Sequence, residues 1–191
     1  RSFGDNGKGR LALNGRTIFL RGEANCCVFP EEGHAPMSVE GWLGVLGRYR
    51  AYGVNCMRFH SYCPPEAAFI AADRMGMLMQ PELSNWNPKD AFETEESFRY
   101  YRDELSQLLR FLANHPSFVM LTFGNELQAS QLGHERMDEL LRLAKQTDPT
   151  RLYANGSNVH FGERGCDAAS DFYTSCQGNP DAPLRGTFSE M

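Results

Sequence analysis

Clustered positive charge is what this sequence lacks most clearly. Its 191 residues include 19 Lys and Arg residues that form no run or stripe, and 24 Asp and Glu residues give a formal net charge of −5. Nucleic acids and anionic membrane surfaces attract proteins through dense basic patches. The charge pattern therefore argues against nucleic acid and against a membrane as partners.

Long apolar runs are also missing. No stretch approaches the roughly 20 residues that cross a bilayer, and no secretory signal peptide is visible. The composition, 41% hydrophobic and 23% charged, is that of an ordinary globular domain with a sizeable core. Because the chain begins at Arg1 rather than Met, we expect it to be a piece of a longer protein whose compartment is undetermined.

Cysteine pairs spaced for metal binding are a third absence. None of the six cysteines forms a C-x-x-C pair. His60 with Cys63 supplies only half of a zinc ligand set, so we predict free thiols and no bound metal. The six are Cys26, Cys27, Cys56, Cys63, Cys166 and Cys176.

A regular alternation of short apolar segments with longer helical ones is present throughout the chain. Apolar spacing predicts helices from Ser38 to Gly53, from Pro64-Pro65 to Gly76, over 98–112 and around 137–144. Strands are predicted at 17–21, 54–59, 77–82, 118–123, 152–155 and 171–174. Strictly alternating strands and helices imply a parallel sheet with right-handed crossovers.

Two architectures fit this alternation: a doubly wound sheet and a (β/α)8 barrel. The first strand-to-helix loop lacks the G-x-G-x-x-G and P-loop patterns of nucleotide-binding sheets. Polar residues instead gather near the strand ends, where barrel enzymes keep their chemistry. They are Glu23, Asn25, Arg58, His60, Glu82, Asn125, Glu126, Asn155 and Tyr173. We predict an α/β fold, a (β/α)8 TIM barrel, with a hairpin at 1–16 and roughly the first six βα units at 17–191.

The segment NHPSFVMLTFGNEL (114–127) reads as a buried strand that ends with an amide and a carboxylate side by side. One interpretation is that Asn125 caps the next helix, with Glu126 at that helix's positive end. The alternative is a functional site, because a buried carboxylate is costly without a partner or a purpose. Several strands offer partners at the same rim, which favours the site.

Four segments in order resemble the catalytic barrel of glycoside hydrolase family 2. They are LNGRTIFLRG, VNCMRFHSYCPPEAAFIAADRMGMLMQPEL, NHPSFVMLTFGNEL and DPTRLYANGS. The resemblance covers nearly the whole chain, and the family includes β-galactosidases, β-glucuronidases and β-mannosidases. It implies a TIM barrel that hydrolyses β-glycosides with retention of configuration and needs no cofactor.

The resemblance also implies roles for individual residues. Glu126 matches the general acid/base, and Asn125 matches the amide that hydrogen-bonds the sugar 2-hydroxyl. Arg58 matches the arginine that ends the second strand, and Glu82 falls where the family has an Asp-Glu pair, here with proline as its neighbour. The order R-F-H-S-Y-C-P-P shifts His60 by one residue from the family's R-x-S-H-Y-P.

Other residues have a functional and a structural interpretation. Trp86 either stacks on a sugar or packs its loop, and His60 either contacts the ligand or bonds within the rim. Arg58 is a substrate contact or an ion-pair partner of Glu82 or Glu126. The residues assigned to substrate binding are Asn125, Arg58, His60, Glu82, Trp86 and Tyr173.

A retaining glycosidase also needs a carboxylate nucleophile about 5–5.5 Å from the acid/base. The only late candidate is Glu190, but residues 175–191 lack the apolar periodicity of a crossover helix. We therefore expect the nucleophile to lie beyond residue 191 and the fragment alone to be inactive.

Two other functions remain open: a non-catalytic carbohydrate-binding barrel and a clan-related endo-acting β-glycanase. Expected partners are a carbohydrate substrate, the remainder of the barrel and further β-sandwich domains. An open barrel edge would favour association into a homo-oligomer.

Overall fold

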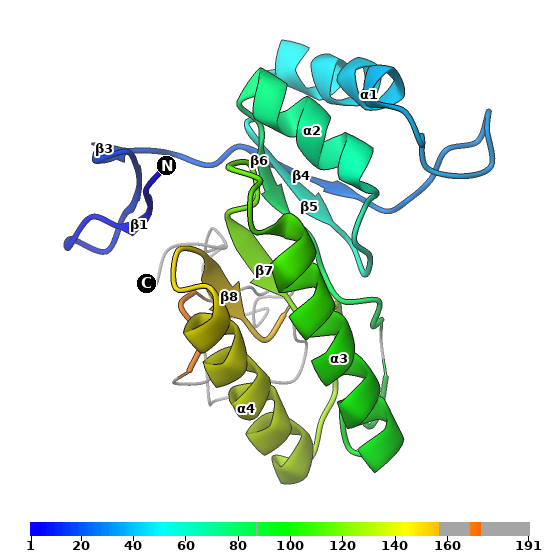
Figure 1. Ribbon diagram of the computed structural model, residues 1–191, viewed down its shortest axis with the longest axis vertical. Helices are drawn as coiled ribbons and strands as arrows, with labels where there is room; N and C mark the ends of the chain where they lie inside the picture. The colour runs from blue at the N-terminus through cyan, green and yellow to red at the C-terminus, as the bar shows by residue number, and fades with distance from the viewer. Residues whose placement is uncertain (87, 157–168, 173–191) are drawn as a thin grey trace, which may run out of the picture.

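The computed structural model describes residues 1–86, 88–156 and 169–172 (Figure 1). An antiparallel N-terminal sheet contains β1 (Phe3–Asp5), β2 (Leu11–Leu13) and β3 (Arg16–Thr17). The parallel strands that follow are β4 (Gly22–Asn25), β5 (Cys56–Phe59), β6 (Leu78–Gln80), β7 (Met120–Thr122) and β8 (Leu152–Ala154). The helices between them are α1 (Val39–Ala51), α2 (Glu66–Met75), α3 (Glu95–Leu112) and α4 (Gln131–Thr147).

The helix ends confirm the capping and terminating residues predicted from the sequence. Ser38 caps α1 by accepting a hydrogen bond from the Gly41 N–H, 3.1 Å away. Helix α2 begins directly after Pro65 and ends at Gly76, whose φ of 70° is the left-handed conformation that glycine adopts without strain. None of the helices in the described part of the chain is long and apolar enough to cross a membrane.

Spatial order follows chain order along the parallel strands. Strand β5 pairs with β4 on one side and β6 on the other, and β7 pairs with β8. Parallel bridges between Glu82 and Thr122 and between Met79 and Phe118 join β6 to β7. A doubly wound sheet reverses its strand order at a switch point, and no reversal occurs along β4–β8.

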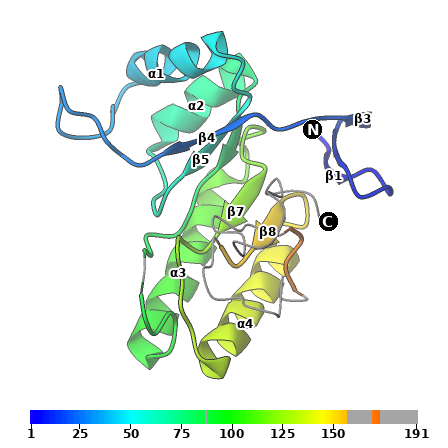
Figure 2. The ribbon, with the colours of Figure 1, turned by 180° about the vertical axis from the view of Figure 1, so that it is seen from behind.

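The two faces of the parallel sheet pack against different partners. Side chains on one face join the four helices in a single apolar cluster, as Met57, Met79, Leu121 and Tyr153 illustrate. Their neighbours in sequence point to the other face and pack against Phe3 and Leu11 of the hairpin; they are Cys56, Leu78, Met120 and Ala154. Figures 1 and 2 show the hairpin apart from all four helices. Helices on one face only are typical of a barrel wall, which within the described residues is not closed.

Two predicted strands differ from the structure. The prediction of a first barrel strand at 17–21 is wrong, because Thr17 ends the hairpin sheet and the parallel strand begins at Gly22. Residues 18–21 alternate in burial like a strand, since Ile18 and Leu20 pack on the hairpin side of the sheet, but they join no strand ladder. Asp171 and Phe172 form a bend, and the rest of the predicted strand 171–174 lies outside the described residues.

The opposite end of the sheet is held by one carboxylate of α2. Asp73 accepts a hydrogen bond from the Ser117 N–H at 2.8 Å and contacts His115 Nδ1 at 2.7 Å. Both partners directly precede β7, so the contact ties the helix to the start of that strand. His115 therefore has a structural place far along the strand from the polar residues described next.

Candidate active site

Glu82 is the centre of the polar cluster at the carboxyl ends of the strands. Its side chain is completely buried. One oxygen, Oε1, accepts hydrogen bonds from Arg58 Nε at 2.7 Å and from Thr122 Oγ1 at 2.9 Å. The other, Oε2, accepts one from the Ser61 N–H at 2.7 Å. Three donors, one of them the Arg58 cation, offset the cost of burying this carboxylate.

Arg58 connects Glu82 to the Asn-Glu pair after β7. While its Nε faces Glu82, its Nη2 donates to Asn125 Oδ1 at 2.6 Å. Of the two carboxylates considered as its ion-pair partner, the structure places Glu82 beside it. The guanidinium thus spans two strand ends and joins a buried anion to a buried amide.

The backbone that presents Asn125 and Glu126 is built on glycine. Gly124 has a φ of 143°, and a Cβ there would lie 2.2 Å from the Asn85 carbonyl oxygen. On its other side, a Cβ on Gly156 would lie 2.5 Å from the Gly124 carbonyl oxygen. The loops after β6, β7 and β8 therefore approach each other through backbone alone, which side chains at these two positions would prevent.

Glu126 follows this turn in a left-handed conformation with a φ of 52°. Its half-buried carboxylate accepts a hydrogen bond from Trp86 Nε1 at 3.2 Å. The indole is 65% exposed, and its ring meets the His60 ring edge-on with centroids 5.6 Å apart. Three residues predicted from separate loops thus form one contiguous surface.

The structure also excludes one of the two interpretations of Asn125. Helix α4 begins after Ser130, which occupies the N-cap position, so Asn125 does not cap it. The amide instead faces Arg58 within the strand-end cluster. The helix-capping interpretation is therefore wrong for Asn125.

The first loop adds a second buried amide. Asn25, at the end of β4, accepts hydrogen bonds at Oδ1 from the Tyr62 hydroxyl at 2.5 Å and from the Cys27 N–H at 3.0 Å. Burial, reinforced by the neighbouring Cys27, raises the pKa of Tyr62 far above its usual range. The tyrosine therefore stays protonated as a donor and holds Asn25 in place.

Several partners of the predicted residues had little signal in the sequence. Thr122 is a hydroxyl inside an otherwise apolar strand, a pattern that indicates a buried hydrogen-bond partner. Ser61 contributes its backbone N–H to Glu82, which any residue type except proline would supply. Tyr62 follows the strand-end histidine without any spacing rule that marks it.

Two predicted residues cannot be placed. Tyr173 and Glu190 lie outside the described residues, so their positions relative to Glu126 stay predictions. Asn155 is buried at the end of β8, where its carbonyl oxygen accepts a hydrogen bond from the Phe123 N–H at 3.0 Å.

Metal ligands and reactive thiols do not gather in the described part of the chain. Among those residues, no group of three or more His, Cys, Asp or Glu side chains is placed to hold a metal ion. Burial raises the pKa of Cys56 and that of Cys63 to about 12, with a smaller contribution from Glu104 at Cys63. Cys26 and Cys27 are exposed free thiols beside the first loop.

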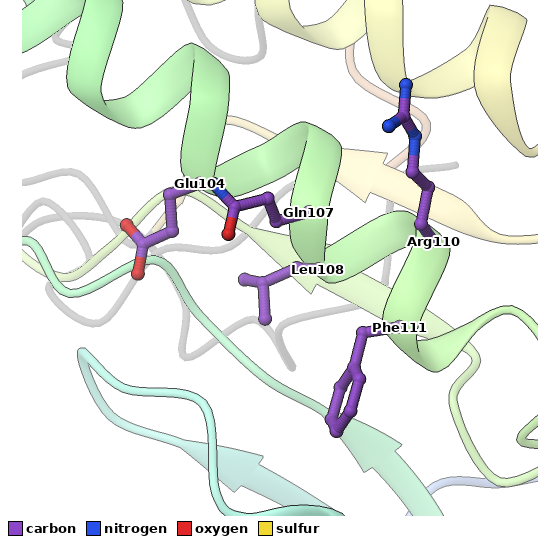
Figure 3. A pocket seen from close by; sticks show the side chains of 5 residues that line it. All are labelled: Glu104, Gln107, Leu108, Arg110 and Phe111. Atoms are coloured by element: carbon purple, nitrogen blue, oxygen red, sulfur yellow. The ribbon is translucent and has the colours of Figure 1, made fainter.

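A shallow hollow of about 540 Å³ lies away from the strand ends, on α3. Figure 3 shows that its lining side chains all project from this helix: Glu104, Gln107, Leu108, Arg110 and Phe111. Within the described residues, Glu104 Oε2 is buried without a hydrogen-bond partner, and burial raises the pKa of this carboxyl. None of the strand-end residues lines the hollow, so it is separate from the candidate site.

The Glu104→Gln substitution is expected to stabilise the protein at neutral pH. A carboxyl whose folded pKa is raised destabilises the fold above its unfolded pKa, and that cost disappears as the pH falls below it. Because the side chain is half-exposed, we expect a gain below ~1 kcal/mol, or about 1–3 °C in Tm at pH 7, and none near pH 3. Thermal unfolding at both pH values measures it, with the exposed Asp103→Asn as control. An equal shift at both pH values would contradict the electrostatic cause.

Comparison with known proteins places this chain in a family. The model described as "Glycosyl hydrolases family 2, TIM barrel domain" matches residues 7–182. A β-glucuronidase of Bacteroides fragilis is 32% identical over 158 residues, which cover 76% of this chain and 22% of that protein. A β-galactosidase of Psychromonas ingrahamii is 27% identical over 148 residues, which cover 75% of this chain and 14% of that protein. The chain therefore spans only about a fifth, or less, of the length of these relatives.

Solved structures show the same fold. A Parabacteroides merdae β-glucuronidase superposes with a TM-score of 0.74 at 23% identity, covering 91% of this chain and 21% of that one. An Eisenbergiella tayi β-galacturonidase bound to galacturonate superposes with a TM-score of 0.71 at 21% identity, covering 84% and 28%. The likeness supports a TIM-barrel fold for the sheet and helices described above. With its match to the family model over residues 7–182, the chain belongs to glycosyl hydrolase family 2.

Proposed function

We propose that this chain is part of a retaining, exo-acting β-glycosidase in which Glu126 is the general acid/base. The observation that carries the proposal is the Asn125-Glu126 pair, presented by the Gly124 turn at the carboxyl end of β7. Barrel enzymes act at this end of their strands. The relatives named above are glycosidases, which supports the same reaction class here.

The proposed reaction has two steps. A carboxylate nucleophile forms a bond to the anomeric carbon while the bond to the leaving oxygen breaks, and Glu126 supplies the proton that this oxygen takes. Water then attacks the anomeric carbon, gives a proton back to Glu126 and releases the carboxylate. Trp86 donates to the ionised form of Glu126 and holds that carboxylate in one orientation between the steps.

The remaining predicted residues are proposed to act around this pair, on the substrate directly or through a neighbour. We propose that Asn125 bonds the sugar 2-hydroxyl and that the exposed faces of Trp86 and His60 contact the substrate. Arg58 is a quarter exposed and reaches the same space, whereas Glu82 meets substrate only through its neighbours. Tyr173 is proposed as a further contact, from the part of the chain that follows β8.

Residues 22–191 are proposed to form roughly the first six βα units of the barrel, after the N-terminal sheet that ends at Thr17. The nucleophile would then come from a later strand, beyond residue 191, and further β-sandwich domains would complete the protein. The chain's coverage of only 14–22% of its relatives supports a longer parent. The isolated fragment would lack a complete active site and would leave the barrel open at one edge, so we expect it to be inactive.

A mechanism-based reagent that traps the glycosyl-enzyme tests this proposal. The 191-residue chain is expected to remain unlabelled, whereas the complete protein is expected to carry the label on a carboxylate outside residues 1–191. Peptide mass spectrometry locates the labelled residue. Label on Glu190 would show that the seventh strand lies within this chain, and no label on the active complete protein would count against a covalent intermediate.

A further inference from the structure

We propose that Glu82 is a positioning residue that acts through Arg58 to fix the orientation of the Asn125 amide. In this orientation the amide offers a hydrogen-bond donor to the substrate, so the site favours sugars with a hydroxyl oxygen at C2. The inference rests on the proposed function, since it concerns how the residue assigned to the 2-hydroxyl is held.

The chemistry of Arg58 determines which end of the amide faces it. A guanidinium carries only donors, so the atom 2.6 Å from Nη2 must be the oxygen of Asn125 and not its nitrogen. Among the residues that the structure describes, none accepts a hydrogen bond from Asn125 Nδ2. The NH2 group is therefore the end of the amide left for a ligand.

Glu82 determines where Arg58 sits. The guanidinium has one acceptor on each side, with Nε against Glu82 Oε1 at 2.7 Å and Nη2 against Asn125 Oδ1. Without the Glu82 carboxylate, the Arg58 guanidinium would keep only its hydrogen bond to Asn125, which does not by itself hold it between the two strand ends. Because Glu82 is completely buried, it is shielded from the substrate and acts only through the residues it holds.

Thr122 and Ser61 determine where Glu82 sits. Gln80 Nε2 lies 3.3 Å from Thr122 Oγ1 and can only donate to it, so the threonine's own proton is free to point to Glu82 Oε1. The Ser61 N–H holds the second oxygen at 2.7 Å. The chain of contacts thus runs from fixed backbone and buried polar side chains to the atom that meets the substrate.

The experiment compares two aryl β-glycosides that differ only in the presence of the 2-hydroxyl, using the complete protein. Hydrogen bonds to this hydroxyl strengthen in the transition state, so the effect is expected in kcat more than in KM. Glu82→Gln removes the charge and places an NH2 group against a donor. We expect kcat to fall about 10- to 100-fold on the hydroxylated substrate and less than about 3-fold on the 2-deoxy substrate. Glu104→Gln, the same change on α3, is expected to alter neither.

Two more variants separate the possible failures. Asn125→Ala is likewise expected to lower kcat much more on the hydroxylated substrate than on the 2-deoxy substrate. An equal fall in kcat on both substrates would overturn the proposed role of Asn125 itself. If Asn125→Ala shows the dependence and Glu82→Gln does not, the proposed function stands and this inference is wrong. Should Glu82→Gln fail to fold, the isosteric Thr122→Val decides: a roughly 3- to 10-fold loss confined to the hydroxylated substrate supports the inference, and an equal loss on both overturns it.

Discussion

Replacing Glu126 by alanine is expected to lower kcat/KM on glycosides with poor leaving groups by about 10³-fold, in the complete protein. General acid catalysis contributes about 10²–10⁴-fold, and a sugar or alkyl leaving group needs the whole of it. An aryl leaving group that departs as a stable anion needs little protonation. The first step on such a substrate should therefore survive, and the glycosyl-enzyme should accumulate because the second step lacks its base.

Burst kinetics across a series of leaving groups measures this difference. The matched control is Glu139→Ala, which removes a half-exposed glutamate of α4 that pairs with Arg102 Nη1 at 3.7 Å. It should keep activity within about 2-fold on every substrate, since an exposed ion pair of this kind contributes little. If Glu126→Ala lost the same factor for good and poor leaving groups, Glu126 would not be the proton donor.

The Gly124→Ala substitution is expected to destabilise the fold by about 3 kcal/mol or more. Its φ of 143° is strained for any residue with a Cβ, and the added carbon would lie 2.2 Å from a backbone oxygen. The contact is with backbone, which cannot rotate away as a flexible side chain can. The loops after β6 and β7 must therefore separate. Because Asn125 and Glu126 follow directly, the candidate site would be displaced with them.

Urea unfolding of the 191-residue chain tests this expectation without any activity assay. Gly44→Ala provides the control, since Gly44 lies inside α1 with open space around its added Cβ. That substitution should raise stability by about 0.5–1 kcal/mol, because alanine favours a helix interior over glycine. Equal unfolding midpoints for Gly124→Ala and the unmodified chain would show that the loops tolerate a side chain there.

The sequence predicted the elements and their order because local rules govern both. Proline before α2 and glycine after it mark its ends, and apolar spacing marks the face that α3 buries. Parallel strands bring their carboxyl ends together whatever their side chains are, so the gathering of Arg58, Glu82 and Asn125 also followed.

Local rules do not decide which side chains pair across strands. Nothing in the sequence chose Glu82 over Glu126 as the partner of Arg58, because both end strands at the same rim and the choice depends on three-dimensional register. The segment 17–21 misled for a related reason. Its alternation reflects the burial of Ile18 and Leu20 against the hairpin side of the sheet. This burial gives the apolar pattern of a strand, although residues 18–21 do not form the hydrogen-bond ladder of one.

The hairpin that packs against the inner face of the sheet has a consequence for synthesis of the chain. Leu11 shares its apolar cluster with Ala154, which is made 154 − 11 = 143 residues later. At about 5–20 residues per second, the ribosome adds those residues in roughly 7–29 s. An isolated hairpin is marginally stable in water, and the surface that covers Phe3 and Leu11 is built up in stages, from Cys56 and Leu78 to Met120 and then Ala154. The hairpin is therefore made well before the surface that covers it is complete, and its apolar residues need protection in that interval.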